Sequence, residues 1–201
     1  MNYRAGFLKI LWMMIMLHFV EANLSCKPRQ LASLTKHEME ICLTKFDEAN
    51  GKPFGTWVPG FPELTVEHNS SVVGAKVQCS LLFLAQSLER ILDDQKNDLN
   101  PEDVSLHKVL RESISRVGLL GACLQGVLGG KCSSPPSPPE MPTKTFERKQ
   151  WSHTLLTAGA HYLHWLQHKL PTPKSKKSRR VALKQRATEL QTYREGSGHL
   201  F

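Results

Sequence analysis

Four histidines near the C-terminal end come closest to a metal-binding or catalytic pattern. They are His153, His161, His164 and His168, and the last three recur on one face of a helix. Imidazole is a zinc ligand, but no carboxylate or cysteine accompanies these residues at a recognised spacing. Neither H-E-x-x-H nor G-x-S-x-G occurs. We therefore expect no metal, no cofactor and no catalysis, with the histidines on the solvent-facing side of a helix.

Five cysteines offer a second kind of chemistry, disulfide formation. They are Cys26, Cys42, Cys79, Cys123 and Cys132, and none belongs to a C-x-x-C pair of the kind found in zinc or redox motifs. The odd number leaves at least one thiol free or intermolecular. Cys42 and Cys79 lie inside apolar helical patterns, so either could be a buried thiol.

The N-terminal segment has the organisation of a secretory signal peptide. Arg4 and Lys9 precede an apolar run of about 11 residues, and small residues up to Ala22 suit cleavage before Asn23. A membrane-spanning helix would need about 20 apolar residues. We predict removal of residues 1–22, secretion without membrane insertion, and an oxidising environment for the cysteines.

The positive charge of the chain is concentrated at its C-terminal end. Residues 174–201 hold eight lysines or arginines against two glutamates, a net +6 of the +8 of the whole chain. The nearly neutral remainder argues against nucleic-acid binding. The flexible tail could bind heparan sulfate or stay a solvated extension. The stretch Lys177-Ser178-Arg179-Arg180 suits a trimming protease, so cleavage after Arg180 would make the tail a removed propeptide.

Four segments with the apolar period of an α-helix must position these residues. They are expected at 28–48, 72–95, 101–129 and 144–170, and no alternating pattern predicts a strand. The predicted core stripes, in chain order, are Leu31, Leu34, Ile41, Cys42 and Phe46; Val77, Leu81, Leu84, Leu88 and Leu92; Leu106, Leu110, Val117, Leu120, Leu124 and Val127; and Trp151, Leu155, Ala158, Tyr162 and Leu166. Four long helices in residues 23–173 indicate one bundle.

The residues before the second and third helices carry local signals. Asn69 and Ser70 are candidate caps of the second helix, and Asn69 also begins an N-x-S sequon, so we predict a glycan on Asn69. Asn100 is a candidate cap of the third helix, with Pro101 at its first position.

The lengths of the links predict the directions of the helices. About five residues join the second helix to the third, so these two must be antiparallel neighbours. The first link has about 23 residues and the third is proline-rich, and each can return along a helix of about 30 Å. A long, then a short, then a long link predicts an all-α, up-up-down-down bundle of the long-chain cytokine type. In that bundle Cys26 lies beside the end of the third helix, which favours a disulfide to Cys123 or Cys132.

Several segments resemble the interleukin-6-type long-chain helical cytokines. Residues 30–34 and 51–54 resemble the first helix of leukaemia inhibitory factor and its continuation, and residues 94–107 resemble its link between the second and third helices. Phe146-Glu147-Arg148-Lys149 resembles the start of the fourth helix in leukaemia inhibitory factor and oncostatin M. The proline-rich link and the basic tail resemble those of oncostatin M. The resemblance implies a secreted cytokine that bridges receptor chains and activates kinase-coupled signalling, and we expect a monomer.

The resemblance also implies two receptor sites. A leukaemia-inhibitory-factor-receptor-like chain would bind Phe146 and Lys149, an aromatic and a cation on one helical face. The other interpretation of Phe146 is a helix-start staple packed into the core. A glycoprotein-130 chain would bind residues of the first and third helices, namely Arg29, Ser33, Gly118, Gly121 and Ala122. The two glycines could equally serve close packing against the first helix.

The sequence departs from the family in one disulfide. The first long link has no cysteine, and His153 stands at the matching position of the fourth helix. A helical hormone of another cytokine subgroup and a secreted lipid-binding helical carrier are the alternative functions.

Overall fold

Each of the four segments with a helical apolar period forms one long α-helix. The structure, a computed structural model, describes residues 26–67, 69–137 and 140–171. The long helices are α2 (Pro28–Asn50), α3 (Gly74–Asp94), α4 (Val104–Leu128) and α5 (Thr145–Lys169). A 3-10 turn, η2 (Pro62–Leu64), lies in the first link, and a π-helical turn, η3 (Gln95–Leu99), continues α3. No strand occurs among the described residues, which confirms the all-helical class, and each helix boundary lies within three residues of its predicted position.

The helix starts differ from the predicted caps. The N-cap of α4 is Asp103, whose Oδ1 accepts a hydrogen bond from the backbone N–H of Leu106 at 2.9 Å. Pro101 lies in the turn before the helix rather than in its first turn. α3 begins after Val73 without a side-chain cap, so the caps predicted at Asn69 and Ser70 are wrong.

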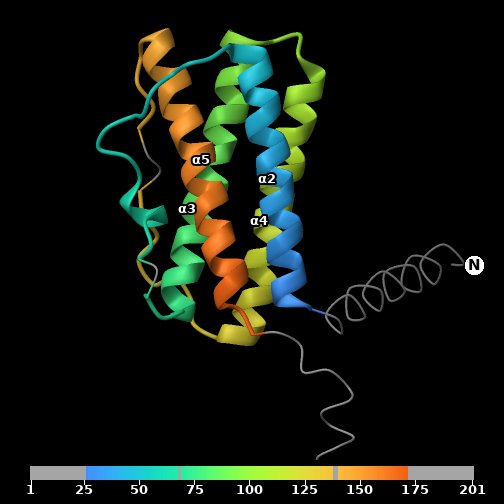
Figure 1. Cartoon of the computed structure of the whole chain (residues 1–201), viewed down its shortest axis with the longest axis vertical. Helices are drawn as coiled ribbons and strands as arrows, with labels where there is room; N and C mark the ends of the chain where they lie inside the picture. The colour runs from blue at the N-terminus through green and yellow to red at the C-terminus, as the bar shows by residue number, and fades with distance from the viewer. Residues whose placement is uncertain (1–25, 68, 138–139, 172–201) are drawn as a thin grey trace, which may run out of the picture. The chain divides into compact units, whose positions relative to one another are not determined.

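The helices pack side by side, and the first link completes their core (Figure 1). α2 packs against α4 and α5, and α3 packs against α4, whereas α3 and α5 share fewer close contacts. η2 contacts both α3 and α5. The buried ring of Phe61, just before η2, has its centre 6.2 Å from that of Phe83 on α3 and 5.3 Å from that of Trp151 on α5. The link therefore fills the space between these two helices.

The predicted core stripes are mostly correct for α3, α4 and α5. The largest fully buried side chains are Trp151, Tyr162, Phe46, Phe83, Met39, Leu84, Leu88, Ile91, Leu106, Leu110, Leu120 and Leu124. Leu92 and Ala158 are only partly buried, and Val127 is exposed. The stripe predicted for α2 is wrong at Leu34 and Ile41, which are 46% and 37% exposed.

Two disulfides fasten the end of the bundle where α2 and α3 begin and α4 ends. Cys26 pairs with Cys123 (Cα–Cα 5.6 Å), one of the two partners that the sequence left open. Cys79 pairs with Cys132 (Cα–Cα 4.9 Å), so Cys42 is the buried free thiol. The 97-residue separation of the first pair corresponds to roughly 4.7 kcal/mol in the chain-entropy model. Two such bonds suit an extracellular or otherwise oxidising environment.

The same end contains a close approach between the start of α3 and the end of α4. A Cβ atom on Gly74 would lie 2.2 Å from the carbonyl oxygen of Gly129 and 3.0 Å from that of Leu128. Gly129 has φ of 69° and ψ of −174°, a backbone conformation that glycine adopts far more readily than other residues. Only glycine at position 74 leaves room for this backbone contact.

We expect Gly74→Ala to lower the free energy of unfolding by about 1–3 kcal/mol, because the new methyl group meets backbone atoms that cannot turn away. Gly126→Ala is the matched control, since Gly126 lies on α4 with no neighbouring atom within 4 Å of the added Cβ. The control should be neutral or stabilising by up to about 1 kcal/mol. Denaturant unfolding of the oxidised protein measures both, and equal losses would contradict the close approach.

Candidate functional site

Phe146 stands in solvent on the first turn of α5. Its side chain is 59% exposed, so the interpretation as a staple packed into the core is wrong. Lys149, one turn later, is partly buried, and its Nζ lies 3.4 Å from the carbonyl oxygen of Asn50 at the end of α2. The first turn of α5 thus presents a large aromatic ring beside a cation that is tied to a neighbouring helix.

Arg148, between these two residues, anchors the start of α5 to the end of α3. Its guanidinium lies 2.9 Å from Asp94 and also pairs with Asp98 of η3. Asp94 is the inner partner, with only 5% of its side chain exposed, whereas Asp98 is exposed. Burial raises the pKa of Asp94, and the nearby Arg148 opposes that rise by favouring the charged carboxylate.

A cluster of amide side chains joins the ends of the other helices beside this ion pair. The Oε1 atom of the fully buried Gln95 accepts hydrogen bonds from Nδ2 of Asn50 (2.9 Å) and Nδ2 of Asn100 (2.7 Å). The Nδ2 group of Asn100 also lies 3.0 Å from Oδ1 of Asn50. His107 on α4 hydrogen-bonds through Nε2 to the carbonyl oxygen of Asn100 at 3.0 Å. These contacts bring the ends of α2 and α3 and the start of α4 to the end of the bundle where α5 begins.

The first link is held along α5 near the same end. Gln150 donates to the carbonyl oxygen of Phe54 (2.8 Å), and the backbone N–H of Trp57 donates to Oγ1 of Thr154 (2.8 Å). The ring of His153 lies against that of Phe54, with centres 5.5 Å apart. Ring packing and hydrogen bonds therefore connect the first link to α5 at this position.

The residues predicted for the glycoprotein-130 site are not brought to one face. Glu38 on α2 pairs with Arg116 at 3.3 Å, which marks the side of α4 that faces α2. The carbonyl oxygen of Gly121 instead accepts a hydrogen bond from Gln78 of α3 at 3.0 Å. Gly118 is exposed with no atom within 4 Å of an added Cβ, so close packing of these glycines against the first helix is wrong.

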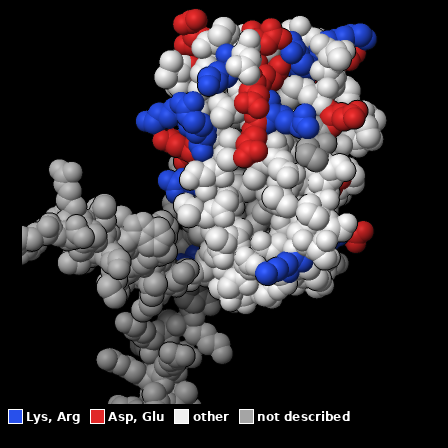
Figure 2. Space-filling model, turned by 180° about the vertical axis from the view of Figure 1, so that it is seen from behind, with Lys and Arg blue, Asp and Glu red and all other residues white. Residues whose placement is uncertain are grey.

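Arg29 and Ser33 are half-buried near the start of α2, and Ala122 is exposed on α4. Successive helical residues turn by about 100°, which puts Gly118 and Ala122 on the outer side of α4. Figure 2 shows charged side chains gathered toward one end of this face of the molecule and few toward the other. The sequence from Val117 to Gly130, which forms the end of α4, has no charged residue. Charge-poor surfaces of this kind are typical of the buried centre of protein interfaces.

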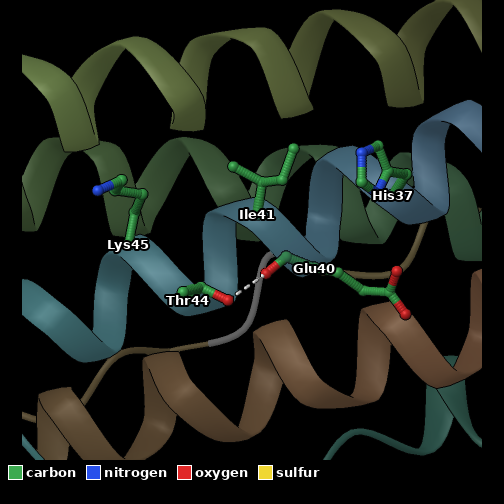
Figure 3. A pocket seen from close by; sticks show the side chains of 5 residues that line it. All are labelled: His37, Glu40, Ile41, Thr44 and Lys45. Carbon is green, nitrogen blue, oxygen red and sulfur yellow. Dashed lines mark hydrogen bonds between the residues drawn. The ribbon is translucent and has the colours of Figure 1, made fainter.

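The structure has a surface depression on α2 that the sequence did not predict. It has a volume of about 330 Å³ and is lined by His37, Glu40, Ile41, Thr44 and Lys45 (Figure 3). The buried residues Ala32, Thr35, Met39, Cys42 and Phe46 recur alternately three and four residues apart, and this run contains neither Leu34 nor Ile41. A core face with this spacing includes the small Ala32 and the polar Thr35. The spacing could therefore have predicted that Leu34 and Ile41 are exposed.

The histidines of α5 and the free cysteine differ in their exposure. His161, His164 and His168 are exposed on α5, and no set of three or more potential metal ligands converges within the described residues. Burial raises the pKa of the Cys42 thiol to about 12, which keeps it protonated and unreactive. In the described part of the chain no helix is long and apolar enough to cross a bilayer. Asn69 is exposed, whereas Ala22, Arg180 and the tail 174–201 lie outside the described residues.

Comparison with known protein families, with curated proteins and with solved structures finds no match. The interpretation of the chain therefore rests on its own residues and geometry.

We expect Arg148→Met to destabilise the protein by about 3 kcal/mol at neutral pH, because it leaves Asp94 buried without its cation. Without Arg148 the pKa of Asp94 rises further, so the loss should shrink as the pH falls through that pKa and the carboxyl group becomes neutral. Lys144→Met is the control, since the exposed Lys144–Glu147 pair should contribute less than about 1 kcal/mol. Unfolding measured from pH 7 to pH 4 tests this, and a loss independent of pH would contradict it.

Proposed function

We propose that this chain is a secreted interleukin-6-type cytokine that bridges a glycoprotein-130-type chain and a leukaemia-inhibitory-factor-receptor-like chain, and so activates kinase-coupled signalling. An up-up-down-down, long-chain bundle is part of the proposal. It is supported by the long, short and long links and by helices of 21 to 25 residues. The Cys26–Cys123 disulfide at one end and the Gln95 amide cluster at the other also support it.

The exposure of Phe146 is the observation that carries the proposal. A phenylalanine that is 59% exposed on a rigid helix has no role in the core, and aromatic side chains are frequent anchors of protein interfaces. Arg148 and Lys149 bond to neighbouring helices, so the turn that presents Phe146 is already ordered before a partner binds. A pre-ordered anchor lowers the entropic cost of association.

The contact for the glycoprotein-130-type chain is proposed on the outer faces of α2 and α4. Leu34 and Ile41 expose apolar surface beside the depression on α2, and Leu119 is 58% exposed on α4. Leu119 follows Arg116 by one helical turn, so it lies on the side of α4 that faces α2. This assignment moves the centre of the site from Arg29, Ser33, Gly118, Gly121 and Ala122 to the exposed apolar residues Leu34, Ile41 and Leu119.

The lipid-carrier alternative has less support. Such proteins work by opening amphipathic helices onto lipid, whereas here most of the large apolar side chains of the four helices are buried against one another and two disulfides join the helices. A hormone of another cytokine subgroup would share the bundle and differ in its receptor. Secretion, loss of residues 1–22, cleavage after Arg180 and binding of heparan sulfate by the tail remain part of the proposal.

We expect Phe146→Ala to weaken binding to a soluble leukaemia-inhibitory-factor-receptor ectodomain by about 30-fold or more, the effect of an interface hot spot. Lys149→Ala should weaken the same binding, whereas binding to glycoprotein-130 should not change. Val58→Ala is the control, because Val58 is an exposed apolar residue (79%) in the first link. Surface plasmon resonance measures all three, and wild-type affinity of Phe146→Ala would contradict the proposed site.

A separate pair of variants tests the proposed contact at Ile41 on α2. Ile41→Asp places a charge in the depression on α2 and should reduce glycoprotein-130 binding by about tenfold or more. The matched change Leu82→Asp alters an equally exposed residue (37%) on α3 and should leave that binding unchanged. Wild-type binding by both variants, with unchanged helix content, would show that the outer face of α2 at Ile41 is not the receptor contact.

A further inference from the structure

Two exposed histidines meet on the last two turns of α5. His164 and His168 are four residues apart on the helix, and their ring centres lie 4.5 Å apart with the ring planes tilted by 50°. Both side chains are exposed, so each ring can turn about its bonds without disturbing the core. His161 is exposed one turn earlier but makes no such ring contact among those that the structure records in the described chain.

The separation of the two rings matches what one metal ion requires. A metal bound at about 2.0–2.1 Å from one nitrogen of each imidazole lies roughly 3 Å from each ring centre. Two ring centres 4.5 Å apart then enclose an angle of roughly 90° at the metal, which is the angle between neighbouring ligands of a square-planar or octahedral ion. Residues four apart on a helix present their side chains on the same face, so the backbone already holds the pair in place.

We propose that His164 and His168 form a two-ligand site for a divalent transition metal, with Cu²⁺ bound more tightly than Ni²⁺ or Zn²⁺. Imidazole nitrogen suits all three ions, and the order follows the general affinity series for nitrogen ligands. Water completes the coordination, because the described residues supply no third ligand. This site is independent of the proposed receptor function.

The position of the pair at the end of α5 favours a cation. His168 and Lys169 belong to the last turn, where the unpaired backbone carbonyl groups make the helix end partly negative. His168 therefore lies where added positive charge is tolerated. The site also adjoins Trp165, whose fluorescence can report a bound Cu²⁺ ion.

The test is a titration of the secreted protein with CuCl2 and with ZnCl2, followed by tryptophan fluorescence and by electron paramagnetic resonance of the Cu²⁺ form. We expect one ion per chain with hyperfine structure from two imidazole nitrogens. His164→Ala and His168→Ala should each weaken Cu²⁺ binding by about tenfold or more, since a single imidazole loses the advantage of a linked second ligand. His161→Ala is the matched control and should bind as the wild type does.

Three outcomes would overturn the proposal. Binding that His164→Ala and His168→Ala leave unchanged would assign the ion to another place. An equal loss of Cu²⁺ affinity in His161→Ala would show that a different set of ligands binds the ion. Absence of a two-nitrogen signal at one equivalent of Cu²⁺ would mean that the two rings only stack against each other.

Discussion

A partly buried polar cluster fixes the end of the bundle that carries Phe146, the proposed contact for the leukaemia-inhibitory-factor-receptor-like chain. Apolar packing holds the helices together, whereas hydrogen bonds and ion pairs between partly buried groups form only in a defined geometry, so they favour one arrangement. Here the oxygen of Gln95 joins Asn50 to Asn100, and Arg148 joins α5 to Asp94. The first turn of α5 is thereby held relative to α2 and α3. Phe146 projects from that turn, and its position follows from these polar bonds rather than from its own packing.

The opposite end is held by a different kind of chemistry. The disulfides Cys26–Cys123 and Cys79–Cys132 join the beginnings of α2 and α3 to the end of α4 and the segment after it, beside the backbone contact at Gly74. Between the two ends the first link lies along the bundle, with Phe61 in the core and Phe54 against His153. This link is therefore a structural element that ring packing and hydrogen bonds hold against α5.

The helices and their order could be predicted from the sequence because they depend on local periods, caps and link lengths. It was harder to predict which face of each helix points into the core. Leu34 and Ile41 are good core residues by type, and only the competing run of Ala32, Thr35, Met39 and Cys42 shows that α2 is turned the other way. Likewise, the choice between Cys123 and Cys132 as the partner of Cys26 depends on where the chain leaves α4. The Arg148–Asp94 pair and the Gln95 cluster join residues roughly 50 apart in the chain, and no local sequence pattern predicts such contacts.

The measurement that tests the central proposal most directly is reconstitution of the complete receptor complex. The oxidised protein, residues 23–180, would be mixed with soluble glycoprotein-130 and leukaemia-inhibitory-factor-receptor ectodomains, and the molar mass of the resulting species would be followed by size-exclusion chromatography with light scattering. We predict a complex that contains one copy of the protein and both receptor chains, formed through two separate surfaces. If neither ectodomain co-elutes with the folded, oxidised protein, the receptor-bridging account is contradicted.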